Sequence, residues 1–179
     1  HLPLVQARNF SISYLKKKIK MKYFYFSFCD SDDLWSPDWL LKVSKFSAHS
    51  YDLIISNGYY KSINRINKIT SGYDNFYKDP FFCPIYLNTV LFHSRLIKNN
   101  INFFDKNFEL IYDIDYWISN FNNLTYISIS DSLSTYVKHG SNLSLTNKKK
   151  IFLERWGILE KHKLSKLKFF YKFLIQILK

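Results

Sequence analysis

Short apolar runs of strand length alternate along this chain with segments in which apolar residues recur every three or four positions. The first run, residues 22–29, has apolar side chains on both faces, which predicts a strand covered on both sides, as in the parallel part of an α/β sheet. Further strands are predicted over 52–56, closed by an Asn-Gly turn, and over 124–129. Helical spacing indicates helices at 7–20, after Ser36-Pro37-Asp38, at 114–121 and from Lys148 onward. This alternation favours an α/β domain.

An acidic cluster, Asp30-Ser31-Asp32-Asp33, follows the first predicted strand directly. Ligands of α/β sheets bind beyond the carboxyl ends of the strands, and the cluster occupies such a position. Carboxylates this close together repel one another, and a bound Mg²⁺ or Mn²⁺ would compensate their charge, because these ions prefer carboxylate oxygens and leave positions open for phosphates. A solvated acidic turn, with Asp33 or Ser36 capping the next helix, explains the same pattern. The pattern alone leaves both interpretations open.

Composition limits the class of protein. The 179 residues, 47% of them hydrophobic, suffice for one domain with a sizeable core. The net charge of +12 favours polyanionic partners: nucleic acid, an anionic membrane face or a phosphorylated substrate. Cys29 and Cys83 show neither metal-ligand spacing nor a disulfide framework, which indicates a reducing, cytoplasmic location. No apolar run reaches the roughly 18 residues of a membrane span. The opening from His1 lacks a signal-peptide pattern, and we expect a fragment whose beginning lies upstream.

Five short motifs stand in an order that is similar to one protein family. The segment Phe26-Ser-Phe-Cys-Asp30-Ser-Asp-Asp-Leu-Trp35-Ser-Pro37 resembles the "flDsDDlw-P" segment of the family 2 glycosyltransferases, which have the GT-A fold. Upstream, Ala7-Arg8-Asn9 resembles the "ARN" element of that family. Three downstream segments are similar to its "G-F-D-E" turn, its "E-D-x-D-x-W" helix entry and its closing "Y-R-x-H-x-x-S-x-S" element: Phe103-Phe-Asp105, Tyr112-Asp-Ile-Asp-Tyr-Trp117 and Tyr136-Val-Lys-His139-Gly-Ser-Asn-Leu-Ser144.

The resemblance implies a fold and a reaction. The expected fold is an α/β, GT-A (Rossmann-like) mixed sheet flanked by helices and lacking its first strands, over residues 1–145, followed by a basic helical tail over 146–179. The expected activity is an inverting glycosyltransferase that moves a sugar from a nucleotide-diphosphate donor to a hydroxyl of a glycan or lipid-linked acceptor, in the synthesis of a cell-envelope or surface polysaccharide. The strands that read the nucleotide in this family have no counterpart before Ala7, so the chain as given is not expected to bind the donor alone.

The matched positions also imply roles for individual residues. Asp32 would bind a divalent cation, Mg²⁺ or Mn²⁺, that bridges the donor diphosphate, and Asp30 would contact the ribose or the cation. Asp113 would be the general base that takes the proton from the acceptor hydroxyl as that oxygen attacks the anomeric carbon. His139 would complete the metal shell. Two basic residues would lie near the phosphates: Arg8 and Lys138, the latter in place of the family's Arg.

Each role has a rival explanation that the residues leave open. Asp113 could cap the helix that follows it, and Asp115 is an equally charged neighbour. His139 could be an exposed bystander, and Arg8 could form an ordinary surface pair. The chain also departs from the family pattern: Tyr112 stands where the family has Glu before the base. An inactive copy is therefore an alternative.

The last sixteen residues, 164–179, combine lysines with aromatic and aliphatic side chains. On a helix, one face of this segment is apolar, which predicts peripheral contact with an anionic membrane, on the inner face of the plasma membrane. A terminal helix that docks on the domain fits the same pattern. A nucleic-acid-binding module is disfavoured, because the aromatic residues lie in buried-looking strands instead of alternating with lysines on one exposed face.

Overall fold

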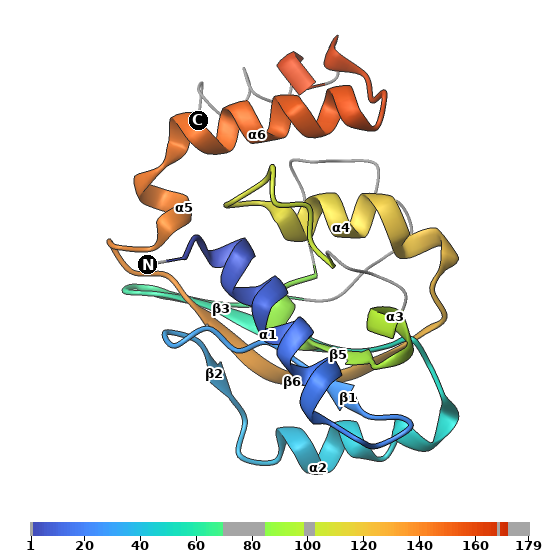
Figure 1. Cartoon of the computed structure of the whole chain (residues 1–179). Helices are drawn as coiled ribbons and strands as arrows, with labels where there is room; N and C mark the ends of the chain where they lie inside the picture. Colours follow the sequence, from blue (N-terminus) through green and yellow to red (C-terminus); the bar gives the residue numbers. More distant parts are fainter. Residues whose placement is uncertain (1, 70–84, 99–102, 168, 172–179) are drawn as a thin grey trace.

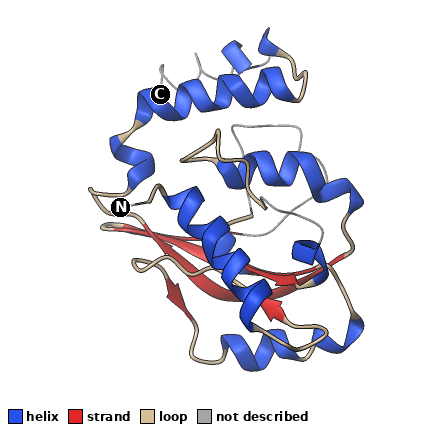
Figure 2. Cartoon of the chain, viewed as in Figure 1, coloured by secondary structure: helices blue, strands red, loops and turns tan. Residues whose placement is uncertain are grey.

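The computed structural model describes residues 2–69, 85–98, 103–167 and 169–171, and it shows a mixed sheet with helices on both faces (Figure 1). Three helices pack on one face: α1 (Leu4–Lys18), α3 (Arg95–Lys98) and α4 (Tyr112–Asn120). Helix α2 (Trp39–Ser44) covers the other face. Two further helices, α5 (Leu143–Thr146) and α6 (Lys148–Lys161), follow the last strand, and α6 lies over α4 (Figure 2). The α/β class is confirmed.

The sheet has the strand order β1-β5-β3-β6-β2, and β4 pairs with β3 as a hairpin. The strands are β1 (Tyr25–Phe26), β2 (Leu34–Trp35), β3 (Leu53–Ser62), β4 (Arg65–Ile69), β5 (Val90–His93) and β6 (Tyr126–Val137). The long strands β3 and β6 are parallel, and every other pair is antiparallel. Short 3-10 turns lie at Ser47–His49, Leu87–Thr89 and Phe121–Asn123.

The side chains of β3 show why the sheet is covered on both faces. Leu53 and Ile55 point into the main core with α1 and α4, while Ile54 points into a smaller core with Trp39 of α2, and all three β3 residues are 0% exposed. Successive side chains of a strand point to opposite faces, so a continuous apolar run requires cover on both sides. The main core is largely aromatic; for example, the Trp117 ring stacks on the Phe92 ring at 5.7 Å.

The prediction for residues 22–29 is half correct. Both faces are covered, since Phe26 lies in the main core and Tyr25 packs against the smaller one. The expected parallel pairing is wrong: β1 is only two residues long, pairs antiparallel with β5, and stands at one end of the described strand order. Burial on two faces reports the layers above and below a strand and carries no information on the direction of its neighbours.

The expected turn at Asn57-Gly58 is also wrong. Strand β3 runs through both residues, and its register against β6 shifts there instead. A Cβ atom on Gly58 would lie 3.0 Å from Ser134 Oγ and 3.1 Å from the Ser134 carbonyl oxygen. The glycine thus permits a close approach at a β-bulge, for which Gly is a known signal. Strand β6 extends to Val137, beyond the strand predicted at 124–129, because it pairs with β3 on one side and β2 on the other.

We expect Gly58→Ala to lower the free energy of unfolding by about 1–3 kcal/mol, the usual cost of forcing extra atoms into a packed site. No described glycine has a positive φ, so this cost comes from the contact with Ser134 and not from backbone strain. Gly140→Ala is the matched control, because a Cβ there meets nothing within 4 Å. Urea unfolding of both variants measures the difference, and equal stabilities would contradict the close approach at Gly58.

The C-terminal segment packs on the domain in its described part. Ile158 of α6 is fully buried in the main core, and Phe169 is 2% exposed, with its ring 5.6 Å from that of Phe152. Leu167, on the predicted apolar face, is 83% exposed. In the part of the chain that the structure describes, no helix has the length and apolar character needed to cross a membrane. Residues 172–179 lie outside the described residues, and the membrane contact and the boundary at residue 145 stay predictions.

Candidate active site

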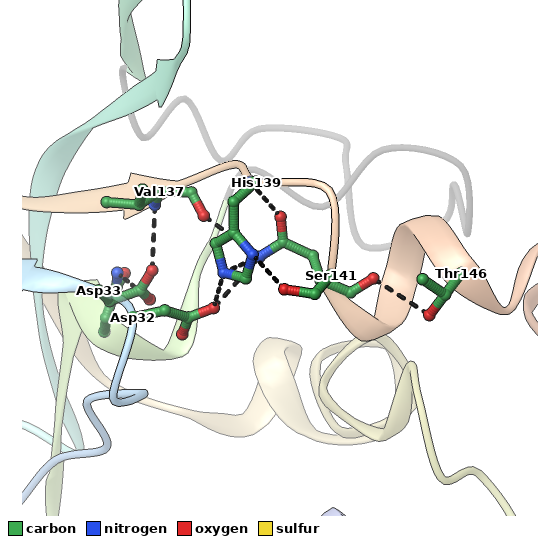
Figure 3. A network of polar contacts seen from close by, with 8 residues as sticks. Asp32, Asp33, Val137, His139, Ser141 and Thr146 are labelled. Carbon is green, nitrogen blue, oxygen red and sulfur yellow. Dashed lines mark hydrogen bonds and ion pairs between the residues drawn. The ribbon is translucent and has the colours of Figure 1, made fainter.

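The acidic cluster forms a tight turn between β1 and β2. The N–H of Asp33 donates to the carbonyl oxygen of Asp30 at 3.0 Å, and β2 then pairs with β6. The turn therefore lies beside the end of β6 (Figure 3). Asp30 and Asp32 are exposed, whereas Asp33 is half-buried.

Asp33 anchors this turn to the rest of the protein. Its carboxylate accepts hydrogen bonds from Asn88 Nδ2 at 2.6 Å and from the N–H of Val137 at 3.2 Å. Burial raises the pKa of Asp33 to about 6, and the neighbouring carboxylates of Asp30 and Asp32 act in the same direction. Helix α2 begins only at Trp39, so Asp33 is bound to β6 and does not cap that helix. Its role in the structure is to hold the other two acids in place.

Asp32 meets the loop that follows β6 (Figure 3). Its Oδ2 atom lies 2.6 Å from His139 Nε2 and accepts a hydrogen bond from Asn142 Nδ2 at 3.2 Å. The other ring nitrogen of His139 lies 2.9 Å from Ser141 Oγ. Two residues 107 positions apart in sequence thus share one small polar group.

This group fits part of a metal site. A carboxylate and an imidazole can bind a divalent cation, whereas the Asn142 Oδ1 atom is occupied by the N–H of His139 at 2.6 Å. Among the described residues no group of three or more His, Cys, Asp or Glu side chains is placed to hold a cation. Mg²⁺ at phosphate-binding sites usually has one or two protein ligands and completes its shell with phosphates and water. Asp32 and His139 could therefore hold a cation only together with a phosphate ligand.

Arg8 connects the acidic turn to α4. Val5, Arg8 and Ile12 share the inward face of α1, so the Arg8 side chain is buried, at 6% exposed, and forms an ion pair with Asp30. Its guanidinium carbon lies 5.1 Å from the centre of the Phe28 ring and 5.2 Å from that of Tyr112. Its Nη1 atom is buried without a hydrogen-bond partner among the described residues. The ordinary surface pair is thereby excluded, because the guanidinium is buried beneath the acidic turn.

Asp113 lies in the first turn of α4, next to this arginine. Burial raises its pKa to about 6, while the charge of Arg8 lowers it and that of Asp30 raises it. Its Oδ1 atom accepts a hydrogen bond from the N–H of Ile114 at 2.9 Å, and the residue that precedes α4 is Ile111, so Asp113 does not occupy the capping position.

Asp115, the equally charged neighbour, has a different environment. It is 3% exposed, and its two carboxylate oxygens contact Lys161 Nζ and His162 Nε2, each at 2.8 Å. Its charge therefore serves to attach the end of α6 to α4. Within the described part of the chain Asp113 has no ion pair, which leaves its carboxylate the more available of the two.

The Lys138 side chain contacts an aromatic pair. Its ammonium lies 5.9 Å from the centre of the Tyr60 ring on β3, and that ring stacks on Tyr136. Trp39 is buried, whereas Trp35 is 37% exposed and stacks on Trp39 at 4.1 Å.

Several residues that shape the site escaped the sequence analysis. Asn9 forms a pair of hydrogen bonds with the backbone of Phe104, donating to its carbonyl at 2.7 Å and accepting from its N–H at 2.9 Å. Asn88 and Asn142 contact the acidic turn. Asparagine is abundant throughout the chain, so its presence at these positions carried no visible signal.

The curled mixed sheet flanked by helices is a glycosyltransferase-like, Rossmann-like fold. The likeness is to the crystal structure of S. aureus TarS 1-349, a staphylococcal glycosyltransferase, with a TM-score of 0.55 and 14% sequence identity. The match covers 91% of this chain and 47% of that chain, so the present chain spans about half the length of the TarS structure. The sequence matches no protein-family model and no curated protein.

Proposed function

We propose that this chain is the acid-bearing part of a metal-dependent, inverting glycosyltransferase that uses a nucleotide-diphosphate sugar. The observation that carries the proposal is the placement of buried Arg8. It is paired with Asp30 of the acidic turn, and it lies close enough to Asp113 that its positive charge partly offsets the rise in the Asp113 pKa caused by burial. Three motifs far apart in sequence thereby meet at one site, on a glycosyltransferase-like fold. The identity with TarS is too low to indicate a substrate, so the donor is proposed from the chemistry of the site.

The residues divide the reaction between two parts of the site. Arg8 offers its free Nη1 donor to the diphosphate, and Asp30 holds the guanidinium in orientation. Asp113 is ionised at neutral pH with a pKa of about 6, which suits a base that must accept a proton near pH 7. It takes the proton of the acceptor hydroxyl as that oxygen forms the new bond to the anomeric carbon, while the bond to the diphosphate oxygen breaks on the opposite face.

Asp32 and His139 would hold the divalent cation, whose chemistry is to neutralise the charge that develops on the departing diphosphate. Asp33 fixes the turn through Val137 and Asn88, so that Asp32 faces the loop after β6. Proposed acceptors are a glycan or a lipid-linked sugar of a cell-envelope or surface polysaccharide, which also accords with a cytoplasmic, membrane-peripheral location.

The proposal is tested with the protein at its natural length. We expect a panel of nucleotide-diphosphate sugars to include one that is hydrolysed or transferred in the presence of Mg²⁺ or Mn²⁺, and we expect EDTA to stop the reaction by removing the ion. Release of free nucleotide diphosphate measures it. Turnover that persists in EDTA would contradict the proposed dependence on a divalent cation. A folded protein without turnover on any donor would contradict catalysis and favour an inactive copy.

A further inference from the structure

Helix α6 lies over α4 and the segment before it (Figure 1). One acid of α6, Glu154, is buried against that segment. Glu154 is 7% exposed, and its carboxylate accepts three backbone hydrogen bonds. The N–H of Glu109 donates to Oε1 at 2.9 Å, and the N–H groups of Leu110 and Ile111 donate to Oε2 at 2.9 and 3.1 Å. These three residues immediately precede α4.

The three bonds satisfy backbone donors just before α4, the last of which is the N–H of its N-cap residue, Ile111. Ile111 has no side-chain cap bond of its own, so Glu154 is the side chain that fixes the backbone at this end of the helix. A buried carboxylate is costly without partners, and here three backbone donors take the place of water. Each group thus satisfies the other, and the path of the chain into α4 depends on a residue more than 40 positions away in sequence.

Other contacts bring α6 close to the same segment. A Cβ atom on Gly157 would lie 3.2 Å from the Phe108 ring, so the glycine lets the buried Phe108 pack against the helix. Lys161 Nζ lies 2.8 Å from carboxylate oxygens of both Asp105 and Asp115, on either side of Asp113 in sequence. These ion pairs attach α6 to the start of the segment and to α4 itself, whereas Glu154 holds the residues between them.

We propose that Glu154 is a positioning residue for Asp113: by holding the N–H groups of residues 109–111 it sets where α4 begins, and so places the Asp113 carboxylate beside Arg8 and away from water. The placement stands on the hydrogen bonds alone, while its catalytic meaning rests on the proposed function. Asp113 follows Ile111 by only two residues, so a displaced Ile111 N–H moves the carboxylate with it.

The test is Glu154→Gln in the protein at its natural length. Gln keeps the size of the side chain but replaces one acceptor oxygen by an NH₂ group, so at least one of the three N–H groups loses its partner. We expect amide hydrogen exchange at residues 109–111 to become roughly 10-fold faster or more, as befits a lost bond to a charged acceptor. Glu160→Gln is the matched control, since Glu160 is exposed on the same helix, and among the described residues its carboxylate contacts Lys166 and Trp156.

A second readout separates positioning from mere stability. A carboxyl-carbon NMR titration should show the pKa of Asp113 falling from about 6 toward the ordinary value of roughly 4, as water reaches it. The charged groups that face Asp113 are Arg8 and Asp30, both unchanged in the variant. In a protein that turns over a donor, the acid limb of the pH–rate profile should move in the same direction.

Either of two results overturns the proposal: unchanged exchange at 109–111, or an Asp113 pKa that stays near 6 after those amides have lost protection. If Glu154→Gln does not fold, Glu154→Asp serves instead, because it keeps the charge and withdraws it by one methylene; the same two results count against the proposal there. The NMR and exchange measurements need no turnover. If the proposed function is wrong but the positioning role is right, catalysis will be absent while the pKa of Asp113 still falls in Glu154→Gln.

Discussion

Replacing Asp113 by Asn is expected to lower the rate of sugar transfer by about 10²–10⁴-fold, the usual contribution of a positioned general base. Asn has nearly the same shape and can still accept the hydrogen bond from the Ile114 N–H, but it cannot take a proton from the acceptor. The loss should fall on the turnover number with little change in donor affinity, because Arg8 and the acidic turn remain in place.

The raised pKa of Asp113 also predicts the direction in which the rate changes with pH. Asp113 must be ionised to act as a base, and its pKa is raised to about 6, so the rate in the wild-type protein should rise as pH increases through about 6. An acid whose pKa is raised by folding is stabilised in its neutral form, and its ionised form opposes folding at neutral pH. Asp113→Asn should therefore unfold at pH 7 no more readily than the wild-type protein.

Asp131→Asn is the control for the loss of one carboxylate, because Asp131 is exposed and, in the described part of the chain, its ion pair is with Lys42 at 2.8 Å. A steady-state pH–rate series for the three proteins, with thermal unfolding at pH 7, makes the comparison. Full activity of Asp113→Asn would show that Asp113 is not the base. An acid limb of the pH–rate profile that is the same in this variant as in the wild-type protein would show the same.

Asp32→Asn is expected to abolish the response to Mg²⁺ or Mn²⁺ and to lower the rate by roughly 10²–10⁴-fold, which corresponds to the several kcal/mol that a metal ion supplies to a charged leaving group. In the structure Asp32 Oδ2 faces His139 and Asn142, and an amide there offers a neutral oxygen or an NH₂ group in place of the charge that a hard cation prefers. The turn itself should persist, because Asp33 carries its hydrogen bonds to β6 and Asn88.

Mn²⁺ binding in the presence of the nucleotide diphosphate, followed by electron paramagnetic resonance, measures this directly. Asp38→Asn is the control: Asp38 follows the same turn, and it pairs with Lys42 at 3.0 Å on the surface, where an ion pair contributes little. An Asp32→Asn protein with wild-type Mn²⁺ affinity would show that Asp32 is not a ligand of the cation.

Local patterns were sufficient where neighbouring residues make the element. A helix was expected at 114–121 and lies at 112–120, so the prediction included Asp115 and placed Asp113 directly before it. Local patterns failed where a partner from elsewhere decided the outcome. Asn57-Gly58 is a common turn signal, but the close approach of Ser134 makes it a bulge inside β3. The strand predicted at 124–129 is likewise longer in the structure, because pairing with β3 and β2 on both sides extends β6 to Val137.

The same division holds in the candidate site. Asp30, Asp32 and Asp33 could be recognised as one group because they are adjacent in the chain, yet their different environments could not be seen. Asp33 is half-buried against Val137, Asp32 meets His139 and Asp30 meets Arg8. The abundance of Asn and Lys in the sequence further concealed the residues that support the acids.

The sequence by itself thus determined the α/β class, the acidic turn after the first strand and the acids at the start of α4, because each depends on the spacing of residues within one element. Only the tertiary structure decided the direction of β1, which of Asp113 and Asp115 is bound by lysine and histidine, and the support of α4 by Glu154. The physical reason is that buried charges and backbone donors must find partners wherever the packed chain offers them. In this protein Arg8, the partner of Asp30, lies 22 positions away in the sequence, and His139, a partner of Asp32, lies 107 positions away.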